Sequence, residues 1–295
     1  MRRKRPSVLT ILLLIAGICV LMYPLISDWY NGRAQTTVMD NYDAAVAELE
    51  DEDFTELWEA AQAYNEGLLG SVVLTEPFDE TAGSELSEEY ASLLNIDGDG
   101  VMGQVRIPKI DVKLPIYHGT SSETLKKGVG HLQNTSLPTG GIATHAVLSS
   151  HTGFPTAALF TDLDTLEEGD LFFLEVLDES LAYRVDRVKV VEPSDISDLY
   201  VDREQDYVTL VTCTPYGVNS HRLLVRGVRT DYEEALEDEQ TVQKVGTWNW
   251  PYIVAGVVLV LILLLYVIYS LIKRKKTDNK KHQAVGKEGV HENEK

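Results

Sequence analysis

Two long apolar stretches lie near the two ends of the chain. Residues 8–26 and 252–272 contain no charged side chain, and each approaches the roughly 20 residues that a helix needs to cross a bilayer. Basic residues precede the first and follow the second, which is the bias of cytoplasmic flanks. The pattern predicts a signal-anchor at 8–26 and a second span at 252–272, with residues 1–7 and the basic tail 273–295 in the cytoplasm. A cleaved signal peptide and a removable sorting signal are the respective alternatives.

The body between these stretches begins with a helical pattern. Apolar residues recur at spacings of three and four within Asp40–Leu69, which predicts an amphipathic helix. They are Phe54, Leu57, Trp58, Ala61, Tyr64 and Leu68. The period is lost in residues 74–84, which contain Pro77 and Gly83, so this segment is predicted to be a loop. We take 27–95 as an extracellular helical segment.

From about residue 103 the pattern changes to alternation of apolar and polar residues, the period of strands. Strands are predicted around 105–107 and 112–116, and then at 146–149, 170–176, 181–191, 207–212 and 223–228. A short helix is predicted at 155–166, and a linker at 231–251. Short strands separated by turns indicate a mainly β domain, either a barrel or a sandwich, over residues 96–230.

Composition narrows the function classes. The chain of 295 residues has 46 Asp and Glu against 26 Lys and Arg, a net charge of −20, which argues against nucleic acid as a partner. Two cysteines exclude a disulfide scaffold. The acidic turn at 97–100 begins like a calcium loop, but Met102 and Pro108 stand where that loop needs Gly and Glu. A simple turn is therefore favoured there.

One cysteine lies outside the apolar stretches. Cys213 ends a predicted strand, and Arg222 follows only nine residues later on the next strand, so the two can reach the same end of the sheet. A thiol nucleophile needs an imidazole partner. The candidates in the outer body are His118, His131, His145, His151 and His221. His151 is modestly preferred because it directly follows an apolar strand.

The sequence around these residues resembles a known family. Residues 209–213 read TLVTC and resemble the TLxTC signature of sortases, the membrane-anchored cysteine transpeptidases of Gram-positive bacteria. Residues 214–227 continue as in class C, the pilin-polymerising sortases, and so do 159–164, 117–120 and 127–132. The resemblance covers about residues 90–230, and the two predicted anchors are consistent with it.

The resemblance implies an eight-stranded closed sortase β-barrel with short helices, and His151, Cys213 and Arg222 as catalytic residues. It implies cleavage of an LPxTG-like sorting signal between Thr and Gly through a thioacyl-enzyme, followed by transfer to a lysine amine of a pilin. In these roles His151 transfers protons, and Arg222 holds the substrate backbone or the oxyanion. Neither a metal nor an organic cofactor is implied.

Class C sortases often carry a lid with an Asp-Pro-aromatic motif, which Glu76, Pro77 and Phe78 resemble with Glu in place of Asp. A second departure is Thr152, where class C sequences commonly have Arg after the catalytic His. Other functions remain open at this point. They are anchoring of surface proteins to cell-wall peptide amines, an inactive membrane-held binding module, and a cysteine protease that uses water as the acceptor.

Overall fold

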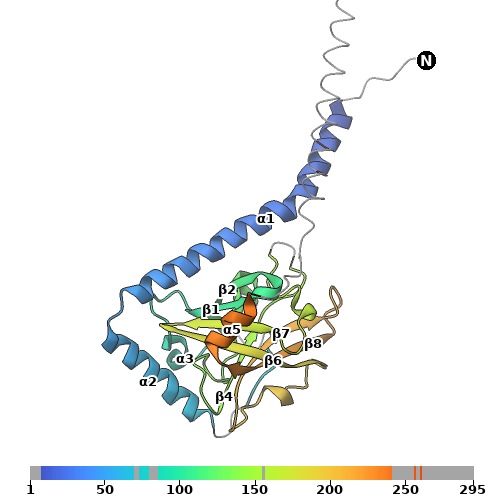
Figure 1. The fold of residues 1–295 in the computed structure, drawn as a ribbon. Coiled ribbons are helices and arrows are strands. Elements are labelled where there is room, and N and C mark those ends of the chain that lie inside the picture. The colour runs from blue at the N-terminus through green and yellow to red at the C-terminus, as the bar shows by residue number, and fades with distance from the viewer. Residues whose placement is uncertain are drawn as a thin grey trace, which may run out of the picture. The chain divides into compact units, whose positions relative to one another are not determined.

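The N-terminal part of the chain is helical. The structure, a computed structural model, describes residues 8–69, 73–79, 86–154 and 157–240, together with the single residues 256 and 260. α1 spans Val8–Ala47 and α2 spans Asp51–Gly67 (Figure 1). The prediction of one continuous helix over Asp40–Leu69 is therefore wrong, because α1 ends at Ala47 and α2 begins at Asp51. The carboxylate of Asp53 accepts a hydrogen bond from the backbone N–H of Glu50 at 2.9 Å, which caps the start of α2 and separates it from α1.

The predicted membrane spans have different outcomes. Among the described residues, no helix is both long enough and apolar enough to cross a membrane. The span predicted at 8–26, which falls within α1, is thus not found. Residues 1–7, the predicted span 252–272 apart from residues 256 and 260, and the tail 273–295 lie outside the described residues.

The described part of the chain contains eight strands that form one closed barrel in the order β1-β2-β3-β4-β7-β8-β6-β5. Their bounds are β1 (Val101–Ile107), β2 (Val112–His118), β3 (Val129–His131), β4 (Thr144–Ser149), β5 (Leu171–Val176), β6 (Glu179–Val191), β7 (Asp206–Thr214) and β8 (His221–Thr230). The β2–β3 and β4–β7 pairs are parallel and the other pairs are antiparallel. The mainly β, eight-stranded closed barrel is confirmed, and the sandwich is excluded.

Alternation along the strands divides their side chains between an inner and an outer face. The largest apolar cluster takes alternate residues from β1, β2 and β4–β8, for example Leu148, Leu210 and Val225. Side chains from strands all around a closed barrel can meet only in its interior, so this cluster is the core that fills the barrel. The predicted face of α2 packs against the same cluster through Phe54 and Trp58, among others.

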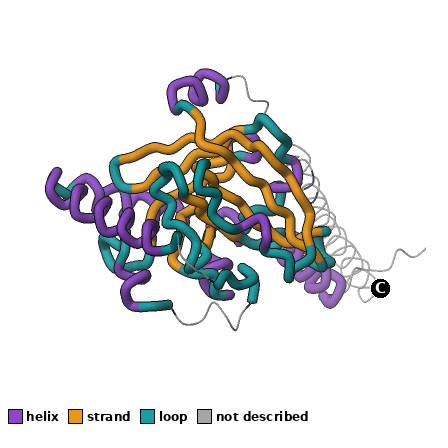
Figure 2. Tube along the Cα trace, turned by 90° about the horizontal axis from the view of Figure 1, so that it is seen from below, coloured by secondary structure: helices purple, strands orange, loops and turns teal. Residues whose placement is uncertain are grey.

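Shorter helices lie outside the strands, as the view in Figure 2 shows. They are α3 (Glu88–Ser92), α4 (Ser122–Lys127) and α5 (Tyr232–Glu239). α5 lies within the stretch predicted as a linker, and its Ala235 is buried against Phe173 and Ala182 of β5 and β6. The helix predicted at 155–166 is replaced, over the residues described there, by turns and a 3-10 helix at Leu163–Thr165.

Candidate active site

The strand β7 carries Cys213 between two neighbours. On one side β4 runs parallel to β7, with Ser149 paired to Val211. Two hydrogen bonds continue this contact past the end of β4, from Ser150 N–H to the Val211 carbonyl at 3.1 Å and from the Thr212 hydroxyl to the Ser150 carbonyl at 2.8 Å. The next residue after Ser150 is His151, so the continued register brings His151 alongside Cys213.

The other neighbour of Cys213 is β8. In this antiparallel pair Cys213 lies directly opposite Arg222, and such cross-strand partners have adjacent side chains. Val211 lies two residues before Cys213 on β7, and Leu224 lies two residues after Arg222 on β8. Both belong to an apolar cluster on the outer face of the barrel. Since strand side chains repeat with period two, Cys213 and Arg222 point to this same outer face. The barrel therefore brings all three predicted catalytic residues together at one end of β4, β7 and β8.

A turn from the N-terminal segment covers these residues. The Glu76 carboxylate accepts a hydrogen bond from Nε of Arg222 at 2.6 Å, and the two side chains are only 19% and 13% exposed. The Phe78 ring centroid lies 5.0 Å from the guanidinium carbon of Arg222 and 5.9 Å from the centroid of the His151 ring. The Glu76-Pro77-Phe78 turn thus contacts both residues that flank Cys213.

The covering segment is also held by apolar contacts. Leu74 is buried in the outer-face cluster that contains Val147, Val211 and Leu224, and Phe78 packs against that cluster. The backbone N–H of Asp79 closes the turn on the Glu76 carbonyl at 3.1 Å. The ion pair of Glu76 and the apolar side chains of Leu74 and Phe78 therefore help to anchor the turn.

Burial favours the neutral forms of the two reactive groups. It raises the pKa of the Cys213 thiol; the Arg222 guanidinium acts against this rise, whereas the Glu76 carboxylate adds to it. Burial also lowers the pKa of His151, and the positive charge of Lys126 lowers it further. With Glu76 against Arg222, the site is in a covered state in which thiol and imidazole are stabilised over thiolate and imidazolium.

Comparison with known proteins identifies the family of this chain. A family model described as the sortase domain matches residues 105–230. The crystal structure of sortase C-1 from Streptococcus pneumoniae is 48% identical, covers 66% of this chain and 99% of its own, and superposes with a TM-score of 0.63. The chain belongs to the sortase family. The sortases are transpeptidases.

Other sortases are similar over different lengths. A pilus-related sortase C of Group B Streptococcus is 42% identical over 66% of this chain and 98% of its own, with a TM-score of 0.62. Among curated relatives, sortase D of Bacillus subtilis is 33% identical over 132 residues, which are 43% of this chain and 63% of that protein. Sortase A of Bacillus anthracis is 27% identical, over 45% of this chain and 61% of its own length. This chain thus spans less than two thirds of these curated relatives.

The loop that carries the imidazole of this sortase is fixed by the residues that follow it. The backbone N–H of Phe160 donates to the His151 carbonyl at 3.0 Å, and that of Gly153 donates to the Thr161 hydroxyl at 3.0 Å. Gly153 has φ +65°, and a Cβ there would lie 2.7 Å from the ring of Tyr216. The left-handed backbone favours glycine here, and the absence of a Cβ lets the Tyr216 ring of the β7–β8 turn pack against the His151 loop.

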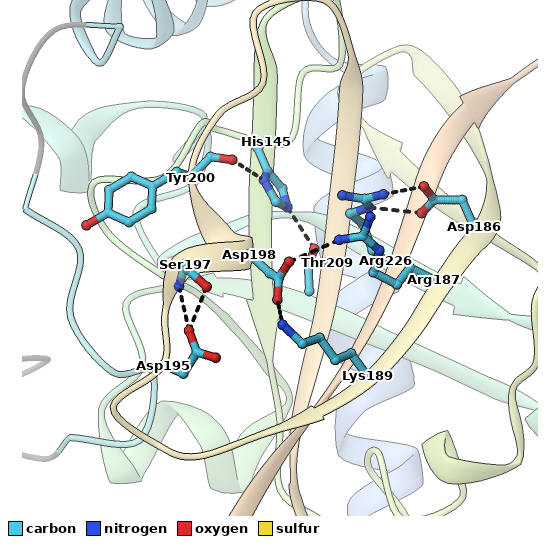
Figure 3. A network of polar contacts seen from close by, with 10 residues as sticks. All are labelled: His145, Asp186, Arg187, Lys189, Asp195, Ser197, Asp198, Tyr200, Thr209 and Arg226. Carbon is cyan, nitrogen blue, oxygen red and sulfur yellow. Dashed lines mark hydrogen bonds and ion pairs between the residues drawn. The ribbon is translucent and has the colours of Figure 1, made fainter.

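The connection between β6 and β7 in the sortase barrel is tied down by polar contacts (Figure 3). Asp198 forms ion pairs with Arg187, at 3.0 Å, and with Lys189. His145 on β4 contacts the Tyr200 carbonyl at 2.9 Å and the Thr209 hydroxyl at 2.7 Å. The connection also brings Leu199 and Ile196 into the outer-face cluster, so these contacts fix one wall of the site beneath the turn.

The other candidate histidines each contact a polar group. Burial lowers the pKa of His145 to about 4 and that of His131 to about 3. Neutral His145 therefore donates from Nδ1 to the Tyr200 carbonyl and accepts from Thr209 at Nε2. His118 faces the carbonyls of Gly100 and Leu93, and His221 faces Glu192 at 3.1 Å.

Several residues of the site were not predicted. Thr209 and Thr212 lie within the quoted TLVTC sequence, but only the structure shows that their hydroxyls bind His145 and the Ser150 carbonyl. Leu74 lies in the segment predicted to be a loop, although an apolar residue two positions before Glu76 is a signal for an anchor. The hydroxyl of Thr152, a departure from class C, contacts the Thr161 carbonyl at 3.5 Å.

Proposed function

We propose that this sortase is a class C, pilin-polymerising transpeptidase held at the membrane. The observation that carries the proposal is the position of Cys213 between His151 and Arg222 beneath a turn that binds Arg222 through Glu76. Identities of 42–48% to solved structures of streptococcal sortase C support it, and one of those proteins is described as pilus-related.

The first half-reaction requires the turn to move away from Cys213. The Cys213 thiol passes its proton to His151, and the resulting thiolate attacks the carbonyl carbon of the Thr–Gly bond in an LPxTG-like signal, so that a C–S bond forms. Arg222, released from Glu76, donates to the developing oxyanion or to the substrate backbone. The C–N bond then breaks while His151 gives a proton to the departing glycine amine. The products are a thioacyl-enzyme and the cleaved C-terminal peptide.

The second half-reaction reverses the proton transfer. A lysine amine of a pilin attacks the thioester carbonyl and loses a proton to His151, and the C–S bond breaks to regenerate the thiolate of Cys213. The new bond is an isopeptide. The alternative acceptors are a cell-wall peptide amine and water, and they use the same two residues.

We propose that the barrel lies on the outer side of the membrane. The apolar stretch 252–272, followed by Lys273, Arg274, Lys275 and Lys276, is the candidate anchor. Membrane fractionation tests for this anchor. It compares cells that express the full chain with cells that express a chain ending at residue 251. Equal recovery of both in the membrane fraction would contradict an anchor in this stretch.

The acyl-transfer test uses the full chain in detergent with an LPxTG peptide and a lysine-containing pilin peptide, followed by intact mass measurement. We expect a thioacyl adduct that disappears in Cys213→Ala, and a peptide–lysine product. The double variant Glu76→Ala with Phe78→Ala provides a form with the turn released. An adduct that yields only a cell-wall peptide conjugate would assign anchoring instead, and one that yields only hydrolysed peptide would assign a protease. A folded protein without any adduct in either form would contradict the transpeptidase.

A further inference from the structure

The imidazole of His151 is contacted by a second phenyl ring besides that of the covering turn. The ring of Phe154 lies 5.6 Å from the imidazole centroid, with the planes only 12° apart. The Phe78 ring lies 5.9 Å away and is tilted by 39°. Phe154 is therefore the ring that stacks on His151, and stacked aromatic pairs contribute beyond the apolar area they bury.

The hydrogen bonds of the histidines show why the ring contacts of His151 matter. Among the residues that the structure describes, none forms a hydrogen bond with either ring nitrogen of His151. His145 and His131, by contrast, are bonded through both nitrogens. A catalytic base is usually oriented by a third group that binds its distal nitrogen. In this site the remaining contacts to the ring are aromatic.

The two phenyl rings are held by different parts of the protein. Phe78 belongs to the turn that must leave before a substrate reaches Cys213. Phe154 lies three residues after His151 and packs against the cluster that fills the barrel. Its loop is fixed by the hydrogen bonds of Gly153 and Phe160. Displacement of the turn therefore removes Phe78 and leaves Phe154 on the imidazole.

We propose that Phe154 is the positioning residue of the site, whose ring fixes the plane of the His151 imidazole once the covering turn has opened. This inference rests on the proposed acyl transfer by Cys213 and His151. In other nucleophile–base pairs a hydrogen-bonding group orients the base. In the open site the ring of Phe154 has this role. The Phe154 ring also excludes water from part of the imidazole. This exclusion contributes to the burial that lowers the pKa of His151.

The test compares three variants of the full chain. Phe154→Leu keeps apolar volume but removes the aromatic plane, and Phe154→Tyr keeps the plane. Phe160→Leu is the control, because Phe160 lies in the same loop and belongs to the core cluster against which Phe154 packs, and no described ring contact joins it to His151. We expect Phe154→Leu to lower kcat for acyl transfer about 10-fold with KM unchanged, since small misplacements of a catalytic group are costly. Phe154→Tyr should retain activity, and Phe160→Leu should retain kcat once folded.

A double-variant experiment makes the inference sharper. Because Phe78 has already left the imidazole when the turn opens, Phe154→Leu should lower kcat by the same factor in the Phe78→Ala background as in the wild type. A loss that appears only when Phe78 is also removed would contradict Phe154 as the ring that orients the imidazole in the open site. Equal losses in Phe154→Leu and Phe160→Leu would show a packing effect only and would overturn the inference.

A second readout needs no substrate. Proton titration of His151, followed by NMR of the full chain labelled in histidine, should give a higher pKa in Phe154→Ala, which removes the apolar cover of the imidazole, than in the wild type, and no change in Phe160→Leu. An unchanged titration in Phe154→Ala would overturn the inference even if acyl transfer is confirmed. Absence of acyl transfer in the wild type, with the titration shifted as expected, would instead reject the proposed function and leave the ring contact established.

Discussion

The outer face of β4, β7 and β8 carries two clusters of the same residue types with opposite properties. One contains His145 and Arg226, and the other contains His151 and Arg222. Both nitrogens of His145 are hydrogen-bonded, whereas His151 is held by ring contacts. The same residue types are thus held by contacts with the barrel itself in one cluster, and by ring contacts and a bond to the covering turn in the other.

The arginines of the two clusters show the same difference. Arg226 binds Asp186 of β6 through Nε at 3.0 Å and Nη2 at 2.5 Å, so both partners belong to hydrogen-bonded strands. Arg222 binds Glu76, which lies on a turn anchored mainly by Leu74 and Phe78. A carboxylate on a strand makes its arginine a permanent structural group. A carboxylate on a turn leaves its arginine available whenever the turn moves.

The largest expected effect separates the two histidines. His151→Ala should lower acyl transfer by about 10²–10⁴-fold, the usual contribution of a proton-transfer group, and Cys213→Ala should abolish it. His145→Ala should leave the chemistry within a few-fold of wild type and lower thermal stability instead. The measurements are rates of peptide–lysine formation and melting temperatures. A comparable rate loss in both histidine variants would contradict the division between the clusters.

The arginines should differ nearly as much. Arg222→Ala should lower kcat by about 10²–10³-fold, as loss of one oxyanion donor does. Arg226→Ala should instead lower the free energy of unfolding by about 2 kcal/mol, because Asp186 loses two charged hydrogen bonds. Rates and denaturant titrations check the two expectations, with Arg222→Lys as a test of whether charge alone suffices. Full activity in Arg222→Ala would remove this residue from the mechanism.

Release of the turn should have a moderate effect on the thiol. Loss of the Glu76 carboxylate stabilises the thiolate, and a freed Arg222 stabilises it further, so the raised pKa of Cys213 should fall. Alkylation by iodoacetamide should then reach half its maximal rate at lower pH in Glu76→Gln, with the rate at neutral pH rising about 10-fold for each unit of pKa shift. Glu192→Gln, which removes a carboxylate facing His221, is the control. Coincident pH curves for the wild type and Glu76→Gln would contradict the covering role of the turn.

The substitution with the smallest expected effect on activity is one that changes the stability of the protein in acid. His145 titrates at about 4 in the folded state against an ordinary value of 6.5, so between these values the unfolded chain binds more protons. Stability is therefore lost as pH falls from 6.5 towards 4. His145→Gln should flatten this loss, with urea unfolding at pH 7 and pH 5 as the measurement. His131, with a pKa of about 3, should retain its share of the slope in the variant. The same slope in wild type and His145→Gln would contradict the assignment.

Much of the site could be predicted because it depends on local sequence. The nine residues from Cys213 to Arg222 leave room only for a tight hairpin between two strands, and the apolar alternation marks those strands. The pairing of β4 with β7 could not be predicted from the period, which indicates strands but not their neighbours. The position of His151 beside Cys213 was therefore modestly favoured from its strand end and became specific only through the family resemblance.

Errors occurred where tertiary or capping contacts override the pattern. The helix predicted over 40–69 is interrupted because the Asp53 carboxylate accepts the backbone N–H of Glu50 and caps the start of α2. The apolar spacing nevertheless continues on α2. The role proposed for Phe154 could not be read from the sequence either, since a phenylalanine three residues after a histidine has no fixed orientation outside a helix. The structure supplies that orientation through the packing of its ring.

The parallel pairing of β4 and β7 has a consequence for the order of folding. His151 and Cys213 are 62 residues apart in the sequence, and the intervening chain passes through β5 and β6 on the other side of the barrel before it returns as β7. Neighbouring parallel strands cannot be joined by a short hairpin, and such distant contacts form late. A partly folded chain therefore carries a thiol without its imidazole, and the two groups meet only when the barrel closes.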